Sequence, residues 1–231
     1  RIFAKAVNCA EGPTVTPCLK CQGCQEITQG RSLDVLEIDG ASNRGIDQIR
    51  SLRELAKFAP VSGTFKVYII DEVHQITSEG FNALLKTLEE PPPHVMFILA
   101  TTAAHKVPAT IVSRCQRYDF KRLPMEVIVS KIKSIAADEK LKVAEEAALG
   151  IAKAAGGSLR DAESILDQVA AFSDGKIRAE DLRALLGTMD EEIFAEVVSA
   201  IGAKEPVRLL RLVADAVNAG TDLGQWTLGF L

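Results

Sequence analysis

The sequence predicts an α/β fold: a core built on a parallel sheet, then a small helical domain and the start of a second one. Three observations lead to this prediction. Short apolar runs rich in β-branched residues alternate with amphipathic helical segments up to about residue 120. Several of these runs end in acidic or hydroxyl residues, as strands do at the carboxyl edge of a parallel sheet. After Pro124 the periodicity is helical throughout.

The core elements follow from this alternation. Strands are expected at 33–39, 66–70 and 95–100, with a further strand at 116–120. Helices are expected between them, the first over 46–58 and the second from Thr77 or Ser78 to the prolines at 91–93, which end it. Strands that alternate with helices in this way pair in parallel through right-handed crossovers.

Amphipathic helical segments make up the rest of the chain. They are expected near 125–138, 144–155, 159–172, 179–186, 190–201 and 205–219. We therefore expect a core domain at 1–123, a small helical domain at 124–187, and the truncated beginning of another helical domain at 188–231.

Composition narrows the class of protein. The 231 residues are 47% hydrophobic and 25% charged, as in ordinary globular proteins with a real core. The net charge is −4, so contact with DNA would require a local basic patch or partner subunits. No apolar run approaches the roughly 20 residues that a membrane helix needs. Residues 1–7 are too short and amphipathic for a signal peptide.

Residues 66–74 carry the most information about function. Val67 to Ile70 form a β-branched and aromatic run, typical of a strand buried on both faces. Asp71 and Glu72 follow where this strand would leave the sheet, and ligands of open α/β folds bind at that edge. The pair suits a nucleotide site in which Asp71 holds Mg²⁺ and Glu72 orients an attacking water. A charged turn after a core strand is the structural alternative.

Cys9, Cys18, Cys21 and Cys24 form a cluster with the spacing C-x8-C-x2-C-x2-C, in a loop rich in glycine and proline. Thiolates two residues apart converge on one metal ion, and four of them complete a tetrahedral zinc site. An iron–sulfur cluster is the competing interpretation, but its usual C-x3-C-P continuation is absent after Cys24. We interpret the cluster as structural zinc with no open position for catalysis. Cys115 is expected to be a buried, inert thiol.

Three other segments contain residues suited to a phosphate site. Thr101 and Thr102 end an apolar strand, where a hydroxyl can bind a γ-phosphate or the attacking water, although polar residues also cap strands for structural reasons. Arg114 is either a solvated charge or an arginine finger that reaches a neighbouring subunit's γ-phosphate. Arg160 lies in the first turn of a helix, where the helix dipole disfavours a cation, and this favours a role at a phosphate. Ser158 before it has a sufficient explanation as the helix N-cap.

The phosphate-binding loop G-x-x-x-x-G-K-[ST] does not occur in the 231 residues. In the expected layout this loop follows the strand that precedes the first helix, and the chain opens within that helix. We therefore expect the sequence to be a fragment whose phosphate-binding loop is encoded upstream of Arg1.

Together, these segments closely resemble the gamma/tau subunits of bacterial DNA polymerase III, the clamp-loader ATPases of the AAA+ superfamily. The resemblance covers essentially the whole chain and rests on motifs in the family's order and spacing, at 9–24, 36–42, 71–74, 81–92, 99–102, 113–115 and 157–162. It implies a Rossmann-like AAA+ core with a zinc-binding insertion at about 9–24. The helical segment 124–187 becomes the lid domain, and 188–231 the start of the oligomerisation (collar) domain.

The resemblance also implies a role for each candidate residue. Asp71 becomes the Walker B residue that holds Mg²⁺, and Glu72 the base that activates water. Thr102, the second threonine of its pair, is taken as sensor 1. Arg114 acts in trans on the ATP of the adjacent subunit, and Arg160 is the sensor 2 residue of its own subunit.

The function implied by the resemblance is clamp loading during DNA replication in the cytoplasm. ATP binding and hydrolysis would drive loading of the beta sliding clamp onto primed template DNA. The implied cofactors are ATP, Mg²⁺ and, on the four cysteines, Zn²⁺. The implied partners are the delta and delta-prime subunits, further gamma/tau copies, the beta clamp and primed DNA, with no membrane. Without the phosphate-binding loop, the fragment alone is expected to be an inactive ATPase.

Two other functions were considered. A non-hydrolysing scaffold like delta-prime shares the cysteine cluster and a Ser-Arg-Cys segment, but it usually lacks the acidic box and the sensor 2 arginine. Asp71, Glu72 and Arg160 therefore argue against it. A DExH-type helicase, suggested by residues 71–74, needs a second RecA-like domain, which the helical segment after residue 124 does not provide.

Overall fold

The computed structural model describes residues 1–186 and 191–218. The chain divides into two compact units, Arg1–Asp119 and Phe120–Leu231, and each is described here by itself. This division and the domain boundary expected at 123/124 both fall in 116–124, a segment without helix or strand. Residues 187–190 and 219–231, which belong to the ends of the two predicted helical domains, lie outside the described residues.

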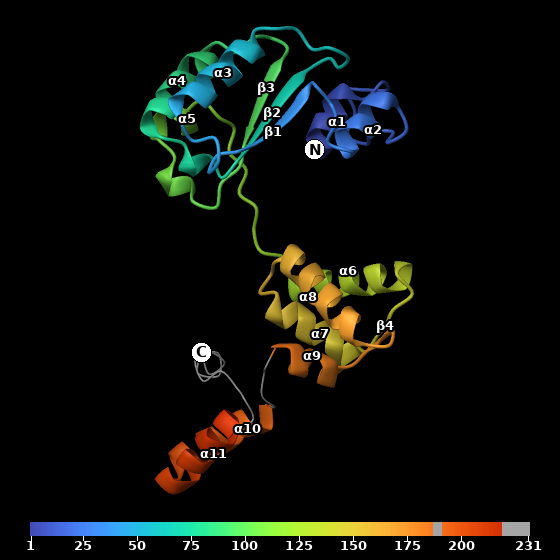
Figure 1. The fold of residues 1–231 in the computed structure, drawn as a ribbon, viewed down its shortest axis with the longest axis vertical. Coiled ribbons are helices and arrows are strands. Elements are labelled where there is room, and N and C mark those ends of the chain that lie inside the picture. The colour runs from blue at the N-terminus through green and yellow to red at the C-terminus, as the bar shows by residue number, and fades with distance from the viewer. Residues whose placement is uncertain (187–190, 219–231) are drawn as a thin grey trace. The chain divides into compact units, whose positions relative to one another are not determined.

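The first unit is built on a sheet of three parallel strands in the order β1-β2-β3 (Figure 1). The strands are β1 (Val35–Asp39), β2 (Lys66–Asp71) and β3 (Val95–Leu99). Helix α3 (Ile46–Ala56) connects β1 to β2, and α4 (Ser78–Glu89), capped by the Thr77 side chain, connects β2 to β3. The predicted α/β core with a parallel sheet is confirmed.

Helices cover both faces of this sheet. The remaining helices of the unit are α1 (Ile2–Asn8), α2 (Gln22–Thr28) and α5 (Ala109–Val112). Tyr68 and Ile70 of β2 belong to a core shared with α3, α4 and α5, whereas Val67 packs with Ala4 of α1 and Ile27 of α2. Figure 1 shows α3, α4 and α5 on one side of the strands and α1 and α2 on the other. Because successive side chains point to opposite faces, the continuous apolar run of β2 is buried on both.

Two polar side chains, the buried Asp34 and the half-buried Asn8, hold the loop that leads into β2. Asp34 accepts hydrogen bonds from the three consecutive backbone amides of 61–63, at 2.7, 2.8 and 2.7 Å. Burial raises the pKa of Asp34, but these hydrogen bonds outweigh it and the pKa lies below its usual value. The Asn8 side chain accepts from the amides of Thr64 and Phe65 and donates to the Phe65 carbonyl at 3.0 Å.

The prediction of a strand at 116–120 is wrong. This segment has no regular secondary structure, and Tyr118 and Phe120 are 70% and 97% exposed. Arg117 binds Asp119 at 2.8 Å within the segment itself. Aromatic residues favour a strand only when a pleated, half-buried surface and a neighbouring strand are present to pack against, and none of the described strands pairs with this segment.

Four helices of the second unit pack around one hydrophobic core. They are α6 (Met125–Asp138), α7 (Glu145–Ala154), α8 (Leu159–Phe172) and α9 (Ala179–Leu186). Ile128, Ile132, Ile151 and Leu166 lie at the centre of this core and are almost completely buried. The predicted helical lid domain is confirmed. Helices α10 (Glu191–Gly202) and α11 (Pro206–Asn218) follow near the predicted positions and pack on each other.

The second unit also contains a short strand pair, which lies between the predicted helices and was not predicted. Strands β4 (Lys142–Val143) and β5 (Lys176–Ile177) form a short parallel pair that connects the segment after α6 with the segment after α8. Ile177 is buried in the core of the unit. Strands of two residues are too short for hydrophobic periodicity to indicate them.

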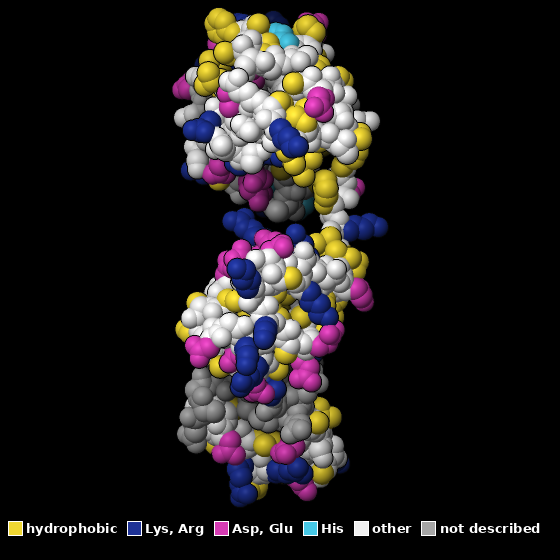
Figure 2. Space-filling model, turned by 90° about the vertical axis from the view of Figure 1, so that its right-hand side faces the viewer, with side chains coloured by type: hydrophobic (Ala, Val, Ile, Leu, Met, Phe, Trp, Pro, Cys, Tyr) yellow, Lys and Arg dark blue, Asp and Glu magenta, His cyan; other side chains and the backbone are white. Residues whose placement is uncertain are grey.

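The surface carries charges of both signs. Figure 2 shows Lys and Arg side chains interspersed with Asp and Glu on the face in view. This distribution agrees with the small net charge of −4 and leaves local patches as the places for a polyanion to bind. Within 1–186 and 191–218, no helix is both long enough and apolar enough to cross a membrane.

Candidate functional site

The candidate site lies where the parallel strands end. β1 ends in Asp39 and β2 in Asp71, and these two residues are partners in the sheet register. β3 ends beside β2, and Thr101 and Thr102 follow it at the same edge. The sheet therefore brings the acidic residues and the threonine pair together, as expected from parallel strands of similar length.

The backbone turns sharply at Glu72. Its φ of 45° and ψ of 43° lie in the left-handed region, which is unusual for a residue other than glycine, asparagine or aspartate. The turn is fixed by hydrogen bonds from the Gly40 amide to the Asp71 carbonyl at 2.8 Å and from the Val73 amide to the Ala100 carbonyl at 2.9 Å. Such a conformation costs about 1–3 kcal/mol and typically occurs at functional sites, so it supports a functional role for this turn.

The two carboxylates of the turn have different surroundings. Oδ1 of Asp71 accepts a hydrogen bond from the Glu72 amide at 2.9 Å. Oε2 of Glu72 accepts from the Thr102 hydroxyl at 3.1 Å and lies 3.1 Å from Nδ1 of His74. Among the described residues, Oδ2 of Asp71 and Oε1 of Glu72 have no protein partner. An exposed carboxylate oxygen that is not already hydrogen-bonded fits Mg²⁺, which takes one or two carboxylates and keeps several waters.

The two threonines differ in their contacts. Oγ1 of Thr101 accepts from the Ala103 amide at 2.9 Å and lies 2.8 Å from Nδ1 of His74. Thr102 is the threonine whose hydroxyl reaches Glu72. Sequence patterns offer no basis for this distinction, because both residues follow the same strand.

Asp39 is explained by its local structure. Its carboxylate accepts hydrogen bonds from the Ala41 and Ser42 amides and from the Ser42 hydroxyl, the last at 2.6 Å. The Ser42 hydroxyl, followed by the backbone amides, lowers the pKa of Asp39. The acidic end of β1 therefore shapes the turn that follows it.

The Arg114 side chain forms contacts with neighbouring residues of the same chain. It follows α5, and its guanidinium forms an ion pair with Glu89 at 2.7 Å and donates to the Thr110 carbonyl at 2.7 Å. The guanidinium is about one-third exposed. Cys115, the next residue, is half-buried, and burial raises the pKa of its thiol, in agreement with an inert cysteine.

Arg160 is the second residue of α8, and its side chain is exposed. The Ser158 hydroxyl accepts from the Asp161 amide, as expected for the N-cap. Gly157 before it has a φ of +91°, a conformation that suits glycine. Arg160 thus lies in the second unit, whereas the turn at Glu72 lies in the first.

The four cysteines of the insertion come together. The Sγ atoms of Cys9, Cys18, Cys21 and Cys24 all lie within 4.8 Å of one another. Backbone amides point at two of the sulfurs, that of Cys18 at Cys9 and that of Cys21 at Cys18, both at 3.4 Å. This donor set of four thiols fits a closed tetrahedral zinc site and leaves no position for a reacting ligand.

The thiols of Cys9, Cys21 and Cys24 differ in their pKa. Backbone hydrogen bonds from Ala10 and Cys24 lower the pKa of Cys21 to about 6. A backbone hydrogen bond from Cys18 lowers the pKa of Cys9, whereas burial raises the pKa of Cys24 to about 12. Since a metal binds the thiolate, binding of a cation at this cluster would displace the proton of Cys24.

Sequence reasoning missed one residue of the site, His74. Its ring is 8% exposed and lies between the Glu72 and Thr101 side chains. The available signal was its place in the same short segment as the acidic pair, within the 3₁₀ turn Val73–Gln75.

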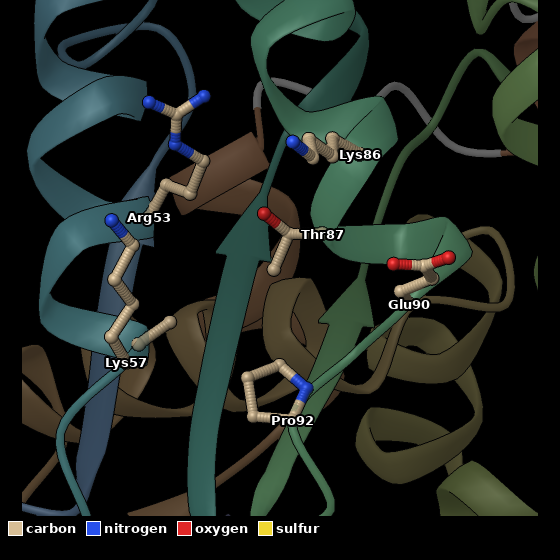
Figure 3. Close-up of a pocket in the computed structure, with 7 residues that line it drawn as sticks. Arg53, Lys57, Lys86, Thr87, Glu90 and Pro92 are labelled. Carbon is tan, nitrogen blue, oxygen red and sulfur yellow. The ribbon is translucent and has the colours of Figure 1, made fainter.

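A basic pocket lies at the opposite end of the strands. It has a volume of about 280 Å³ and lies between the carboxyl ends of α3 and α4. In Figure 3, Lys86 of α4 points toward α3, from which Arg53 and Lys57 project, and Glu90 adds one carboxylate. Arg53 and Lys57 both form ion pairs with Glu54, so Lys86 is the cation of this pocket without an ion-pair partner among the described residues.

Comparison with known proteins identifies the family. Residues 1–124 match the family described as DNA polymerase III, delta subunit, and residues 127–175 match the DNA polymerase III clamp loader subunit, ATPase lid domain. The chain is 47% identical over 222 residues to DNA polymerase III subunit tau of Bacillus subtilis and 43% identical over 222 residues to that of Escherichia coli. These alignments cover 96% of the chain but only 39% and 34% of the two relatives.

A solved structure supports the fold alone. The RuvB Holliday junction branch migration motor of Thermotoga maritima aligns with a TM-score of 0.57 at 17% identity, over 87% of this chain and 69% of that one. The chain belongs to the DNA polymerase III clamp-loader family, as a relative of its gamma/tau subunits.

Proposed function

We propose that the chain is part of a clamp-loader ATPase whose hydrolysis of ATP drives loading of a ring-shaped sliding clamp onto primed DNA in the cytoplasm. The single observation that carries this proposal is the turn at Glu72, where two carboxylates leave the central strand beside a hydroxyl at 3.1 Å. The gamma/tau membership of the chain supports the same activity. The phosphate-binding loop is proposed to lie in the part of the protein outside these 231 residues.

The chemistry assigns a task to each side chain. Asp71 would hold Mg²⁺, directly or through water, and the ion would neutralise charge on the phosphates. Glu72 accepts a proton from the attacking water at Oε1, and the water oxygen forms a bond to the γ-phosphorus. The bond from the γ-phosphorus to the bridging oxygen breaks, and its electron pair leaves with ADP. Thr102 fixes Glu72 from the adjacent strand, in the role of sensor 1.

The two arginines complete the proposed site from outside the Glu72 turn. Arg114 would leave Glu89 and reach the γ-phosphate of a neighbouring subunit, where a guanidinium stabilises the transition-state charge. Arg160 would bind the γ-phosphate of its own subunit as sensor 2. Its exposure and its place in the first turn of a helix, which is unfavourable for a cation, support a phosphate partner.

We propose a structural role for the metal site and a DNA-binding role for the basic pocket. Zn²⁺ on the four cysteines would stabilise the insertion at 9–24 without taking part in hydrolysis. The cations of Arg53, Lys57 and Lys86 suit the phosphate backbone of DNA. The protein partners would be delta and delta-prime subunits, further gamma/tau copies and the beta clamp.

The decisive experiment measures ATP hydrolysis and ATP binding of the full-length protein in its assembled clamp loader. Glu72→Gln is expected to lower the turnover number by at least about 100-fold while the ATP dissociation constant stays within about twofold, since a general base contributes 10²–10⁴-fold. Glu79→Gln, an exposed carboxylate in the first turn of α4, is the matched control and is expected to have no effect. Undiminished hydrolysis by Glu72→Gln contradicts the proposal and favours a non-hydrolysing scaffold like delta-prime.

A further inference from the structure

His74 is a buried side chain at the candidate site to which neither the sequence nor the proposed reaction gives a role. It lies in the 3₁₀ turn Val73–Gln75, two residues after Glu72. Its Nδ1 atom is 2.8 Å from the Thr101 hydroxyl and 3.1 Å from Oε2 of Glu72. A single ring nitrogen thus contacts both the acidic pair and the threonine pair.

The other ring nitrogen determines where the proton is. Nε2 of His74 lies 3.2 Å from the side-chain nitrogen of Gln75. The Gln75 amide nitrogen donates to Nε2, and the Glu72 carboxylate beside Nδ1 can only accept, so both contacts favour the tautomer whose proton is on Nδ1. An unprotonated Nδ1 would direct its lone pair at the Glu72 carboxylate, which is unfavourable. The Nδ1 of His74 therefore forms its hydrogen bond with the Thr101 hydroxyl and lies within ion-pair distance of Oε2 of Glu72, at 3.1 Å.

The Thr102 hydrogen bond and the His74 contact fall on the same oxygen of Glu72. Thr102 reaches Oε2 from the end of β3 and His74 reaches it from the 3₁₀ turn, each at 3.1 Å. Among the described residues, Oε1 has no protein partner. A hydrogen bond and an ion-pair contact on one oxygen restrict the rotation of the carboxylate and leave the other oxygen to accept a proton.

We propose that His74 is a positioning residue for ATP hydrolysis: its Nδ1–H fixes Oε2 of Glu72 so that Oε1 faces the attacking water. The inference rests on the proposed function and deepens it. Through Thr101, the same nitrogen also couples the orientation of Glu72 to the backbone after β3. His74 itself contacts neither water nor nucleotide in this mechanism.

Two amide substitutions test this role in the full-length protein, assembled with its partner subunits and primed DNA. The side-chain nitrogen of His74→Asn occupies the place of Nδ1, whereas that of His74→Gln occupies the place of Nε2. We expect His74→Gln and His74→Ala to lower kcat about tenfold or more, with the KM for ATP within twofold. His74→Asn is expected to retain at least about half of the wild-type kcat. His94→Gln is the matched control, because His94 lies at the other end of the strands and contacts the carbonyls of Ala56 and Phe58 at the end of α3 and just after it.

The outcomes separate this inference from the proposed function. Equal losses in His74→Asn and His74→Gln, or a higher KM at unchanged kcat, contradict a positioning role. The two amides decide the matter even if His74→Ala fails to fold, and thermal melting checks that both variants are native. If Glu72→Gln abolishes hydrolysis but His74→Gln does not reduce it, only the inference fails. If the wild-type assembly does not hydrolyse ATP, or if Glu72→Gln hydrolyses it at the wild-type rate, the proposed function and the inference about His74 both fail.

Discussion

The Thr102 hydroxyl donates a hydrogen bond to Oε2 of Glu72 at 3.1 Å. This contact connects the residue after the end of β2 with the loop after β3, so two neighbouring strands together determine the orientation of one carboxylate. Thr101, one residue earlier, contacts His74 instead. The two threonines can therefore be separated by experiment.

Removal of the Thr102 hydroxyl is expected to slow hydrolysis in the assembled full-length protein. Thr102→Val keeps the side-chain shape but removes a hydrogen bond to a charged group, worth about 1.5–3 kcal/mol. A loss of this size in the transition state corresponds to at least a tenfold lower kcat. Thr102→Ser keeps the hydroxyl and should remain close to wild type in the same steady-state assay. A wild-type rate for Thr102→Val would remove Thr102 from the site.

Substitution of Arg114 is expected to lower hydrolysis only where subunits adjoin. Arg114→Ala removes the guanidinium that the proposal places against a neighbour's γ-phosphate, and an arginine finger contributes 10³–10⁵-fold to kcat. The measurement compares the ATPase rate of the assembled loader with that of the isolated full-length subunit. Arg117→Ala, which breaks only the local pair with Asp119, serves as the control. An equal loss in the isolated subunit would show that Arg114 acts within its own chain.

The basic pocket makes a prediction about DNA binding. Lys86 has no ion-pair partner among the described residues, so Lys86→Ala removes one cation without exposing a carboxylate. We expect affinity for primed DNA to fall similarly for all sequences, and the salt dependence of binding to decrease by about one charge. Titrations at several salt concentrations measure both effects. Lys133→Ala, on the second unit, is the control. An unchanged salt slope for Lys86→Ala argues against a phosphate contact in the pocket.

The cysteine cluster is expected to bind one zinc ion per chain. Cys21→Ser removes a ligand and should abolish stoichiometric zinc in protein purified under reducing conditions, whereas Cys115→Ser should not. Because metal binding displaces thiol protons, affinity should weaken as the pH falls. The raised pKa of Cys24, about 12, adds to this dependence throughout the physiological range. Elemental analysis of the wild-type protein that finds no zinc contradicts the site.

Asp34 is expected to stabilise the fold without affecting the chemistry. Asp34→Asn replaces one acceptor oxygen by a donor that faces backbone amides, which should cost about 1–3 kcal/mol of unfolding free energy. Since its pKa is lowered in the folded protein, the wild-type contribution is present above pH of about 4 and is lost as the pH falls through the folded pKa. Urea unfolding at several pH values measures this, with the exposed Asp47→Asn as control. An acid dependence that persists in Asp34→Asn would have another source.

The strand ends and the cysteine cluster were predictable because they depend on order along the chain. Parallel strands of similar length bring Asp71 and Thr102 to one edge, and short C-x2-C spacings bring thiols together, whatever the side-chain rotamers are. Two contacts depend instead on a left-handed turn and on particular rotamers. They are the hydrogen bond from Thr102 to Glu72 and the position of His74 against Thr101 and Glu72. Sequence patterns contain neither.

The errors have equally specific causes. Tyr118 and Phe120 are typical of strands, but propensity alone does not supply a partner strand. The pair of β4 and β5 is too short to produce a periodic signal, and it forms because Ile177 is buried against the helices around it. Helix α2, whose first residue follows Cys21, was hidden within a segment that its glycine and proline content marked as a loop.

Asn8 and Cys9 are adjacent in sequence but serve different structures. The Asn8 side chain accepts hydrogen bonds from the residues just before β2, and Cys9 belongs to the thiol cluster. The backbone between them transmits any rearrangement of the insertion to the entrance of the central strand. The amide protons of Thr64 and Phe65, which bind the Asn8 side chain, are therefore natural reporters of whether the insertion is intact, and faster hydrogen exchange there would reveal its loosening at a distance from every cysteine.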